Sequence, residues 1–137
     1  MPESNINIKL AQNEIFESNR LRLRRIKMSD AADIFSYASD PQLATNAGFK
    51  VAVTLEDTQN DIATWFETNR LNIWGLEDKL SGRLIGSIQL KITGRRGEFG
   101  WSLNPDFWGQ SLMAEAAGLL RDFAFSELAL DVLITAF

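Results

Sequence analysis

Few side chains of this sequence are able to move a proton or attack a carbonyl group. Its 137 residues include no histidine and no cysteine. An imidazole base, a Ser–His pair, a thiol nucleophile and a zinc site built on those ligands are therefore excluded, and we expect no metal site. Proton transfer is left to carboxylates, lysines, backbone groups, water and the single tyrosine, Tyr37. We interpret Tyr37 as an aromatic residue of the core or of a groove rather than as an acid.

The segment from Glu98 to Arg121 combines a strand, a turn and the start of a helix. Residues 98–103 have the pattern of a strand, Asn104-Pro105 ends it, and a long helical stretch follows. A last apolar run covers residues 132–137, and a strand that returns over a helix runs parallel to its neighbour. This crossover places the N-terminus of the helix beside the end of a strand, which is a place to bind phosphate.

The strands upstream of this segment predict an α/β chain with a mixed sheet. Four runs with a strand pattern lie at residues 21–26, 71–76, 84–92 and 98–103. We expect them to lie antiparallel in sequence order, with only the last strand parallel to residues 98–103. Between the first two runs, helices are expected to begin at Ser29, Pro41 and Thr54, and Asp57 is placed to complete a capping box with Thr54.

Charge and length exclude several classes of protein. The net charge is −4 and the sequence pI about 4.8, which argues against non-specific binding to nucleic acid or anionic lipid. No apolar run is long enough to cross a bilayer, and the first residues have no secretory pattern, so we expect a cytoplasmic protein. Residues 1–137 are expected to form one domain, with residues 1–19 as an extended lead-in.

Three groups of residues resemble the GCN5-related N-acetyltransferase (GNAT) superfamily, in its branch that acetylates the N-terminal amines of ribosomal proteins. They are residues 19–24 with 28–33 and 39–41; residues 84–88; and residues 100–109 with Glu115-Ala116, 123–125 and 127–128. The resemblance implies an acyl-CoA N-acyltransferase-like fold with acetyl-CoA as cosubstrate. The family continues beyond its corresponding last strand with a helix and two more strands, so the resemblance implies a C-terminally abbreviated fold here.

The resemblance implies transfer of an acetyl group to a primary amine, by direct attack of the amine in a ternary complex. The acceptor is a protein N-terminus or a small amine. By the same resemblance, the backbone N–H near Leu103 polarises the acetyl carbonyl. Glu98, on the same strand, is the candidate base, acting directly or through water. An exposed carboxylate paired across the sheet is an equally good interpretation of Glu98.

The resemblance also places the two ends of acetyl-CoA. The pantetheine is expected along Ser102, Leu103 and Asn104, and the pyrophosphate on the backbone of residues 109–114. The residues of this second group are Gly109, Gln110, Ser111, Leu112, Met113 and Ala114.

Two of these positions depart from the family pattern. Ser111 replaces a glycine where a positive φ is expected. Met113 replaces a small residue, so its bulk is expected to crowd either the phosphate or the packing of the helix against the strand. These departures favour an alternative, a catalytically impaired relative that binds CoA or forms oligomers. A chain completed by another copy is a further alternative. We also expect the apolar edge at residues 132–137 to drive self-association into a homo-oligomer.

Overall fold

The computed structural model describes residues 2–47 and 50–135, and it contains one mixed six-stranded sheet. The strands are β1 (Phe16–Glu17), β2 (Leu21–Arg24), β3 (Ile73–Asp78), β4 (Leu84–Thr93), β5 (Arg96–Leu103) and β6 (Val132–Ile134). Their order in the sheet follows the sequence, with every neighbouring pair antiparallel except β5 and β6, which are parallel. The predicted mixed α/β fold and the parallel last strand are confirmed. Residues 136–137 of the predicted last strand lie outside the described residues.

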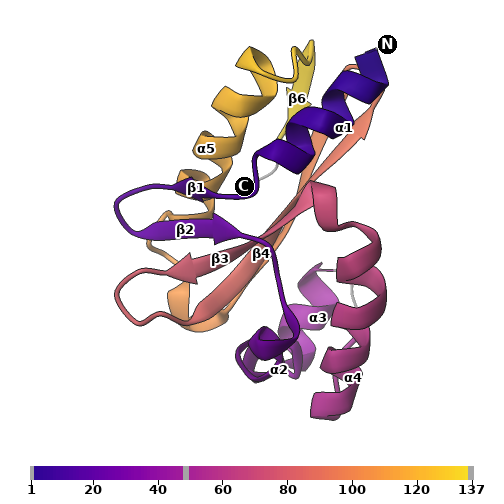
Figure 1. The fold of residues 1–137 in the computed structure, drawn as a ribbon. Helices are drawn as coiled ribbons and strands as arrows, with labels where there is room; N and C mark the ends of the chain where they lie inside the picture. Colours follow the sequence, from indigo (N-terminus) through magenta and orange to yellow (C-terminus); the bar gives the residue numbers. More distant parts are fainter. Residues whose placement is uncertain (1, 48–49, 136–137) are drawn as a thin grey trace.

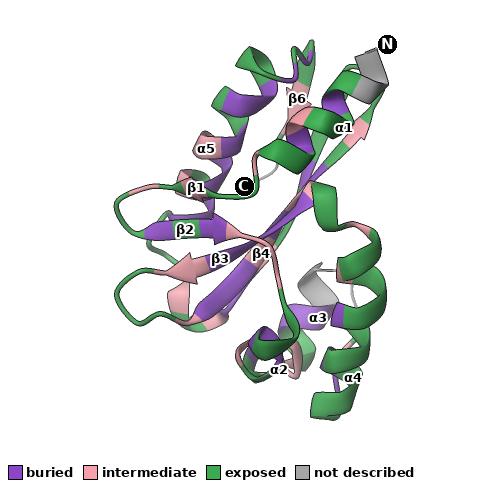
Figure 2. Cartoon of the chain, in the orientation of Figure 1, coloured by how far each residue is buried: buried purple, intermediate pink, exposed green. Residues whose placement is uncertain are grey.

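The helices form two groups on the sheet (Figure 1). They are α1 (Pro2–Gln12), α2 (Ala31–Ala38), α3 (Pro41–Ala47), α4 (Leu55–Asp61) and α5 (Leu112–Ser126), and a π-helical segment, Ile62–Phe66, continues α4. Buried side chains of α1 and α5 share one core cluster with the sheet. Those of α2, α3 and the π-helical segment form a second cluster with Leu84 of β4. The buried positions run along β2, β3 and β4, between the two groups (Figure 2). Among the described residues, no helix is long and apolar enough to cross a membrane.

The prediction of an extended lead-in over residues 1–19 is wrong for its first part, which is helix α1. Ile6 and Leu10 lie one helical turn apart and are both buried in the core. The guanidinium of Arg25 donates to the carbonyl of Leu10 at 2.8 Å and stacks over Trp74, 4.9 Å from the ring centroid. Tertiary contacts with Arg25, which follows β2, and burial in the core therefore stabilise a helix that its own weakly periodic sequence does not predict.

The start of α2 also differs from the prediction that Ser29 caps it. A 3-10 turn, Met28–Asp30, precedes the helix, and Asp30 is the N-cap. Arg24 holds the carboxylate of Asp30 with two nitrogens, at 2.8 and 2.9 Å, and its Nε donates to Glu77 at 2.8 Å. Asp30 is buried, and an unpaired buried carboxylate costs more free energy than a missing side-chain cap. The ion pair with Arg24 therefore sets the start of the helix. The capping box predicted at Thr54 and Asp57 is confirmed.

Candidate functional site

The two halves of β5 have different neighbours on the side away from β4. Arg96, Gly97 and Glu98 pair with Val132, Leu133 and Ile134 of β6. Beyond them, residues 99–103 border a cavity of about 760 Å³ that extends to the first turn of α5. The strand therefore leaves its parallel neighbour, as expected for a strand that opens a gap beside a helix N-terminus.

The backbone at the end of β5 points the amide of Leu103 toward this cavity. The N–H of Asn104 donates to the carbonyl of Ile85 on β4 at 2.7 Å. Because successive amides of a strand alternate in direction, the N–H of Leu103 is directed to the opposite edge, where the cavity lies. Ser102, Leu103 and Asn104 are thus the last strand residues before the turn, and the first two line the cavity.

A short turn leads from β5 back toward the strand. Pro105–Phe107 form a 3-10 turn, and the Asn104 Oδ1 accepts the N–H of Asp106 at 2.9 Å. The indole Nε1 of Trp108 then donates to the carbonyl of Leu103 at 2.8 Å. Trp108 comes just before the residues predicted to hold the pyrophosphate, and nothing in the sequence shows that the turn brings its ring back to the strand.

The predicted phosphate-binding residues gather at the N-terminus of α5. Gly109 and Ser111 have φ values of +79° and +59°, so the positive φ expected at Ser111 is present. The N–H of Glu115 makes the helical bond to the carbonyl of Ser111, and the first-turn amides of Leu112, Met113 and Ala114 precede it. All of these except Glu115 line the cavity, whereas Gln110 is exposed in the same loop and does not line it.

The bulk of Met113 lies in the packing between α5 and the sheet, one of the two places where the sequence predicted crowding. Its side chain is only 6% exposed and packs in the core cluster that α5 forms with the sheet. Met113 also lines the cavity, and crowding of a phosphate there stays a prediction. Ser111 is the departure that counts, because a side chain in the left-handed region is strained by about 1 kcal/mol.

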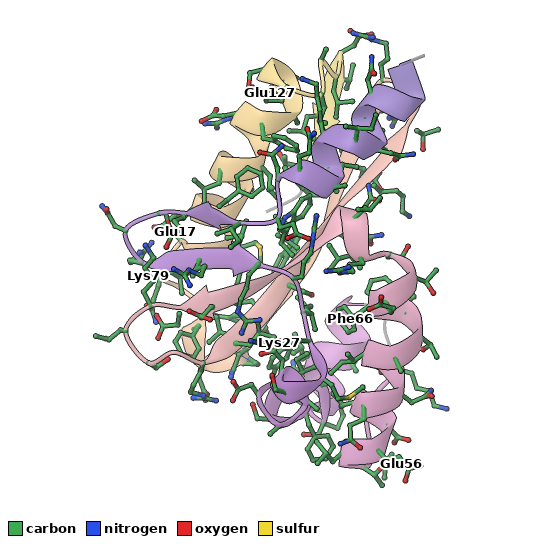
Figure 3. The ribbon with its side chains drawn as sticks, in the orientation of Figure 1. Glu17, Lys27, Glu56, Phe66, Lys79 and Glu127 are labelled. Atoms are coloured by element: carbon green, nitrogen blue, oxygen red, sulfur yellow. The ribbon has the colours of Figure 1, made fainter. Side chains whose placement is uncertain are left out.

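A second cavity, of about 500 Å³, lies on the other face of the sheet, beside α2 and the π-helical segment. Its lining includes Tyr37, Asp61 and Trp65. Phe66, at the end of the π-helical segment, packs against the core cluster of α2 and α3 (Figure 3). Both cavities are lined by the same three consecutive residues, Gly100, Trp101 and Ser102. This part of β5 therefore borders both cavities.

Glu98 is not brought into either cavity. It is exposed and lies opposite Lys91 of β4 and Ile134 of β6. It shares a face of β5 with Gly100 and Ser102, because side chains two residues apart point the same way. The register therefore places its carboxylate on the face of the second cavity, one pair beyond the residues that line it.

Two titratable groups line the second cavity: Tyr37, a buried groove aromatic as predicted, and Asp61, which the sequence analysis did not single out. The pKa of the Tyr37 hydroxyl is raised by burial and by the negative charges of Asp30 and Asp33, although a hydrogen bond with Ser102 opposes the shift. Tyr37 therefore stays a phenol. Burial, and then the charge of Asp57, also raise the pKa of Asp61. In the sequence, the spacing of Asp61 and Trp65, one helical turn apart, indicates that they share a face of the helix, and this face lines the cavity.

Glu115 has a structural role at the edge of the site. Its carboxylate accepts from Arg20 at 2.8 and 2.9 Å and from the Ser18 hydroxyl, which ties the start of β2 to the first turn of α5. Desolvation acts to raise the pKa of Glu115, but these hydrogen bonds outweigh it and the pKa is lowered. Among the described residues, no cluster of carboxylates is arranged to hold a metal ion.

Comparison with known proteins identifies this architecture. The family described as the acetyltransferase (GNAT) domain matches residues 20–137. The chain belongs to the GNAT acetyltransferase family. The uncharacterized N-acetyltransferase YoaA of Bacillus subtilis (strain 168) is 30% identical over 123 residues, covering 85% of this chain and 70% of YoaA. The uncharacterized N-acetyltransferase p20 of Bacillus licheniformis is 26% identical over 125 residues, covering 86% of this chain and 70% of p20.

Solved structures share the GNAT fold. A GNAT-family acetyltransferase from Bacillus anthracis superposes with a TM-score of 0.73 at 24% identity, covering 88% of this chain and 72% of that one. The ribosomal-protein-S5-alanine acetyltransferase from Vibrio fischeri gives a TM-score of 0.64 at 24% identity, covering 90% and 73%. The predicted family and activity are confirmed: this GNAT protein is an acetyltransferase that transfers the acetyl group of acetyl-CoA to an amine.

Proposed function

We propose that acetyl-CoA lies in the larger cavity and the amine acceptor in the smaller one, so that they react where the cavities meet. The observation that carries this assignment is the shared lining of Gly100, Trp101 and Ser102. The larger cavity suits an extended anionic cosubstrate, because it runs from an open strand edge to a helix N-terminus. Attack across β5 then needs no covalent enzyme intermediate.

The backbone residues have separate roles in this proposal. The amides from Gly109 to Ala114 hold the pyrophosphate, and Ser102, Leu103 and Asn104 hold the pantetheine arm. The N–H of Leu103, directed at the cavity, donates to the acetyl carbonyl oxygen as negative charge develops there. The first two of these interactions supply binding, and the third supplies stabilisation specific to the reaction.

Glu98 is proposed as the base that accepts the amine proton through water. Support comes from its position on the same face of β5 as Ser102, beyond the residues that line the acceptor cavity. Glu98→Gln is expected to lower kcat about 100-fold at neutral pH, with the Kd for acetyl-CoA unchanged. Asp61→Asn is the comparison, because Asp61 lines the cavity itself. A large loss only in the Asp61 variant would move the role to that carboxylate.

The acceptor is proposed to be a protein N-terminus or a small amine that carries an apolar group. Aromatic and aliphatic side chains dominate the lining, with Trp65, Phe66 and Ile73 among them. Among the described lining residues Asp61 is the only carboxylate, and Lys50 is near it. A polyamine would need more than one negative partner. Release of the CoA thiol can be followed directly with a thiol reagent, because the chain has no cysteine. Turnover of spermidine in preference to peptides with apolar N-terminal residues would refute this acceptor class.

A CoA-binding relative with impaired catalysis is the second candidate, and the strained Ser111 favours it. Calorimetric titration with acetyl-CoA separates the possibilities. Binding together with thiol release supports the enzyme; binding without turnover of any amine supports the impaired relative; and the absence of binding rejects both.

Self-association through β6 is proposed as well. In the described sheet β6 is an edge strand, and its first residue, Val132, is half exposed. An edge of this kind pairs readily with another strand. Sedimentation at micromolar concentration should show an oligomer that Ile134→Lys shifts toward the monomer, and a well-folded wild-type monomer would contradict the proposal.

A further inference from the structure

One peptide group at the end of β5 is held from both sides. This group joins Leu103 to Asn104. Its carbonyl oxygen accepts from the Trp108 indole at 2.8 Å, and its N–H donates to the Ile85 carbonyl at 2.7 Å. Both distances are those of good hydrogen bonds. The plane of this peptide is therefore fixed by one contact from the sheet and one from the turn that follows it.

The fixed peptide determines where the preceding amide points. Ser102 is in register with Ser87 of β4, so the chain is also held just before Leu103. With both neighbours held, the backbone dihedral angles of Leu103 have little freedom, and its N–H keeps one direction toward the larger cavity. A donor is effective for a developing charge only when its direction is set in advance, because a hydrogen bond weakens steeply as its angle departs from linear.

Trp108 supplies the contact that the sheet cannot. The Leu103 carbonyl points away from β4, and β6 pairs only with residues 96–98, so neither neighbouring strand can donate to it before the chain turns through Pro105–Phe107. Apolar packing alone does not explain the indole at this place, because Trp108 is 45% exposed. Its ring N–H nevertheless donates a hydrogen bond to the Leu103 carbonyl. The next residue, Gly109, begins the loop that leads to α5.

We propose that Trp108 is a positioning residue for acetyl transfer: its indole N–H orients the Leu103 amide that polarises the acetyl carbonyl, and it does so from the start of the phosphate loop. This inference rests on the proposed role of the Leu103 amide. It adds that phosphate binding and carbonyl polarisation are coupled through one side chain, since Trp108 and Gly109 are adjacent and both line the cavity.

The test compares acetyl-CoA with CoA, which have the same phosphates and pantetheine and differ in the carbonyl group. Trp108→Phe keeps an aromatic ring and removes the N–H. We expect this variant to bind CoA within about twofold of wild type, to lose most of the wild-type preference for acetyl-CoA, and to lower kcat by about tenfold. With carbonyl-labelled acetyl-CoA, the infrared C=O stretch should be lowered on binding to wild type and should return toward its solution value in the variant.

Trp65→Phe is the matched control, because it makes the same change at a similarly exposed tryptophan that lines the other cavity. It should leave the C=O stretch of bound acetyl-CoA as in wild type. If Trp108→Phe does not fold, hydrogen exchange of the Trp108 indole N–H in the wild-type protein provides the readout. The proposed hydrogen bond to the Leu103 carbonyl requires this proton to be protected from exchange, and to be more protected with acetyl-CoA than with CoA.

The outcomes that overturn the inference are distinct. Equal losses of CoA and acetyl-CoA affinity in Trp108→Phe would make Trp108 a support of the phosphate site only. An unchanged C=O stretch and an unchanged preference would show that the indole contact has no effect on the amide. A wild-type protein that binds acetyl-CoA without any shift of the C=O stretch would reject the role of Leu103 itself. Failure of the wild type to bind either ligand would reject the proposed cavity assignment.

Discussion

The two halves of β5 pair with β4 in the same way but have different neighbours at their other edge, a strand for the first half and a cavity for the second. Every residue from Arg96 to Leu103 is in register with β4. The first half also pairs with β6, whereas the second half borders the larger cavity. The first half fixes the strand in the sheet, and the second leaves one edge facing the cavity where we propose that acetyl-CoA binds. One strand thus serves both purposes because its parallel neighbour covers only part of its length.

Each half of β5 involves one glycine: Gly97 belongs to the first half, and Gly86 of β4 lies opposite the end of the second. A Cβ on Gly86 would collide with the carbonyl oxygen of Ser102 and lie 3.2 Å from the Cα of Leu103. A Cβ on Gly97 would meet only the ends of leucine side chains, at 2.9 to 3.1 Å. Backbone cannot yield as a side chain does, so the second half of β5 depends on a glycine in a way that the first does not.

The largest expected effect follows from this difference. Gly86→Ala should lower the free energy of unfolding by about 3 kcal/mol, and Gly97→Ala by about 1 kcal/mol, because overpacking costs less where rotamers can adjust. Urea denaturation of both variants measures the difference. In addition, Gly86→Ala should weaken acetyl-CoA binding, since it displaces Ser102 and Leu103 at the cavity. Equal destabilisation by the two substitutions would show that both halves of β5 are equally rigid.

The next comparison concerns two residues of the phosphate loop and the helix that follows it. Met113→Ala removes a buried side chain and should lower the free energy of unfolding by about 2 kcal/mol or more. Ser111→Gly relieves a left-handed residue and should raise the unfolding free energy by up to about 1 kcal/mol, with unchanged or tighter acetyl-CoA binding. Thermal melts and calorimetry on the separate variants measure these effects. A stabilised Met113→Ala protein would contradict the burial of that side chain.

The smallest effect is a pH dependence at Tyr37, which lies behind the second half of β5. Burial raises the pKa of its hydroxyl above the ordinary value of 10.0. The folded state then holds the proton more tightly than the unfolded state, so the stability that Tyr37 contributes is complete below pH 10 and is lost as the pH rises toward the folded pKa. Because Tyr37 is the only tyrosine, phenolate absorbance measures it directly, in native protein against protein in urea. Tyr37→Phe, which lacks the signal, is the control. A native titration at or below pH 10 would contradict the burial of this hydroxyl.

Much of the fold could be predicted from local patterns. Alternating apolar residues indicated the strands, and Thr54 with Asp57 indicated a helix start, because these signals depend on residues close in sequence. Helix α1 could not be predicted in this way. It is stabilised by Arg25 and Trp74, which are far from it in the sequence, and its own pattern is weak.

The candidate site likewise has a part that local sequence patterns indicate and a part that only the structure shows. The sequence indicated Ser102 to Asn104 and Gly109 to Ala114, since a strand, a turn and a helix start are all written locally. It did not show that Met113 points into the core, that Trp108 returns to Leu103, or that Asp61 and Tyr37 line a second cavity. Those facts depend on the direction of side chains relative to the sheet, which a motif does not encode.

By itself, then, the sequence determined the order of the strands and helices from residue 21 onward, the strand–turn–helix that we propose meets the cosubstrate, and the absence of thiol and imidazole side chains. Tertiary structure alone decided where β6 stops along β5, and therefore which residues of β5 border a cavity. It also decided that Gly100, Trp101 and Ser102 border both cavities. The physical reason is that backbone and side-chain chemistry is local, whereas the length of a strand pairing and the space between two elements depend on how the whole chain packs.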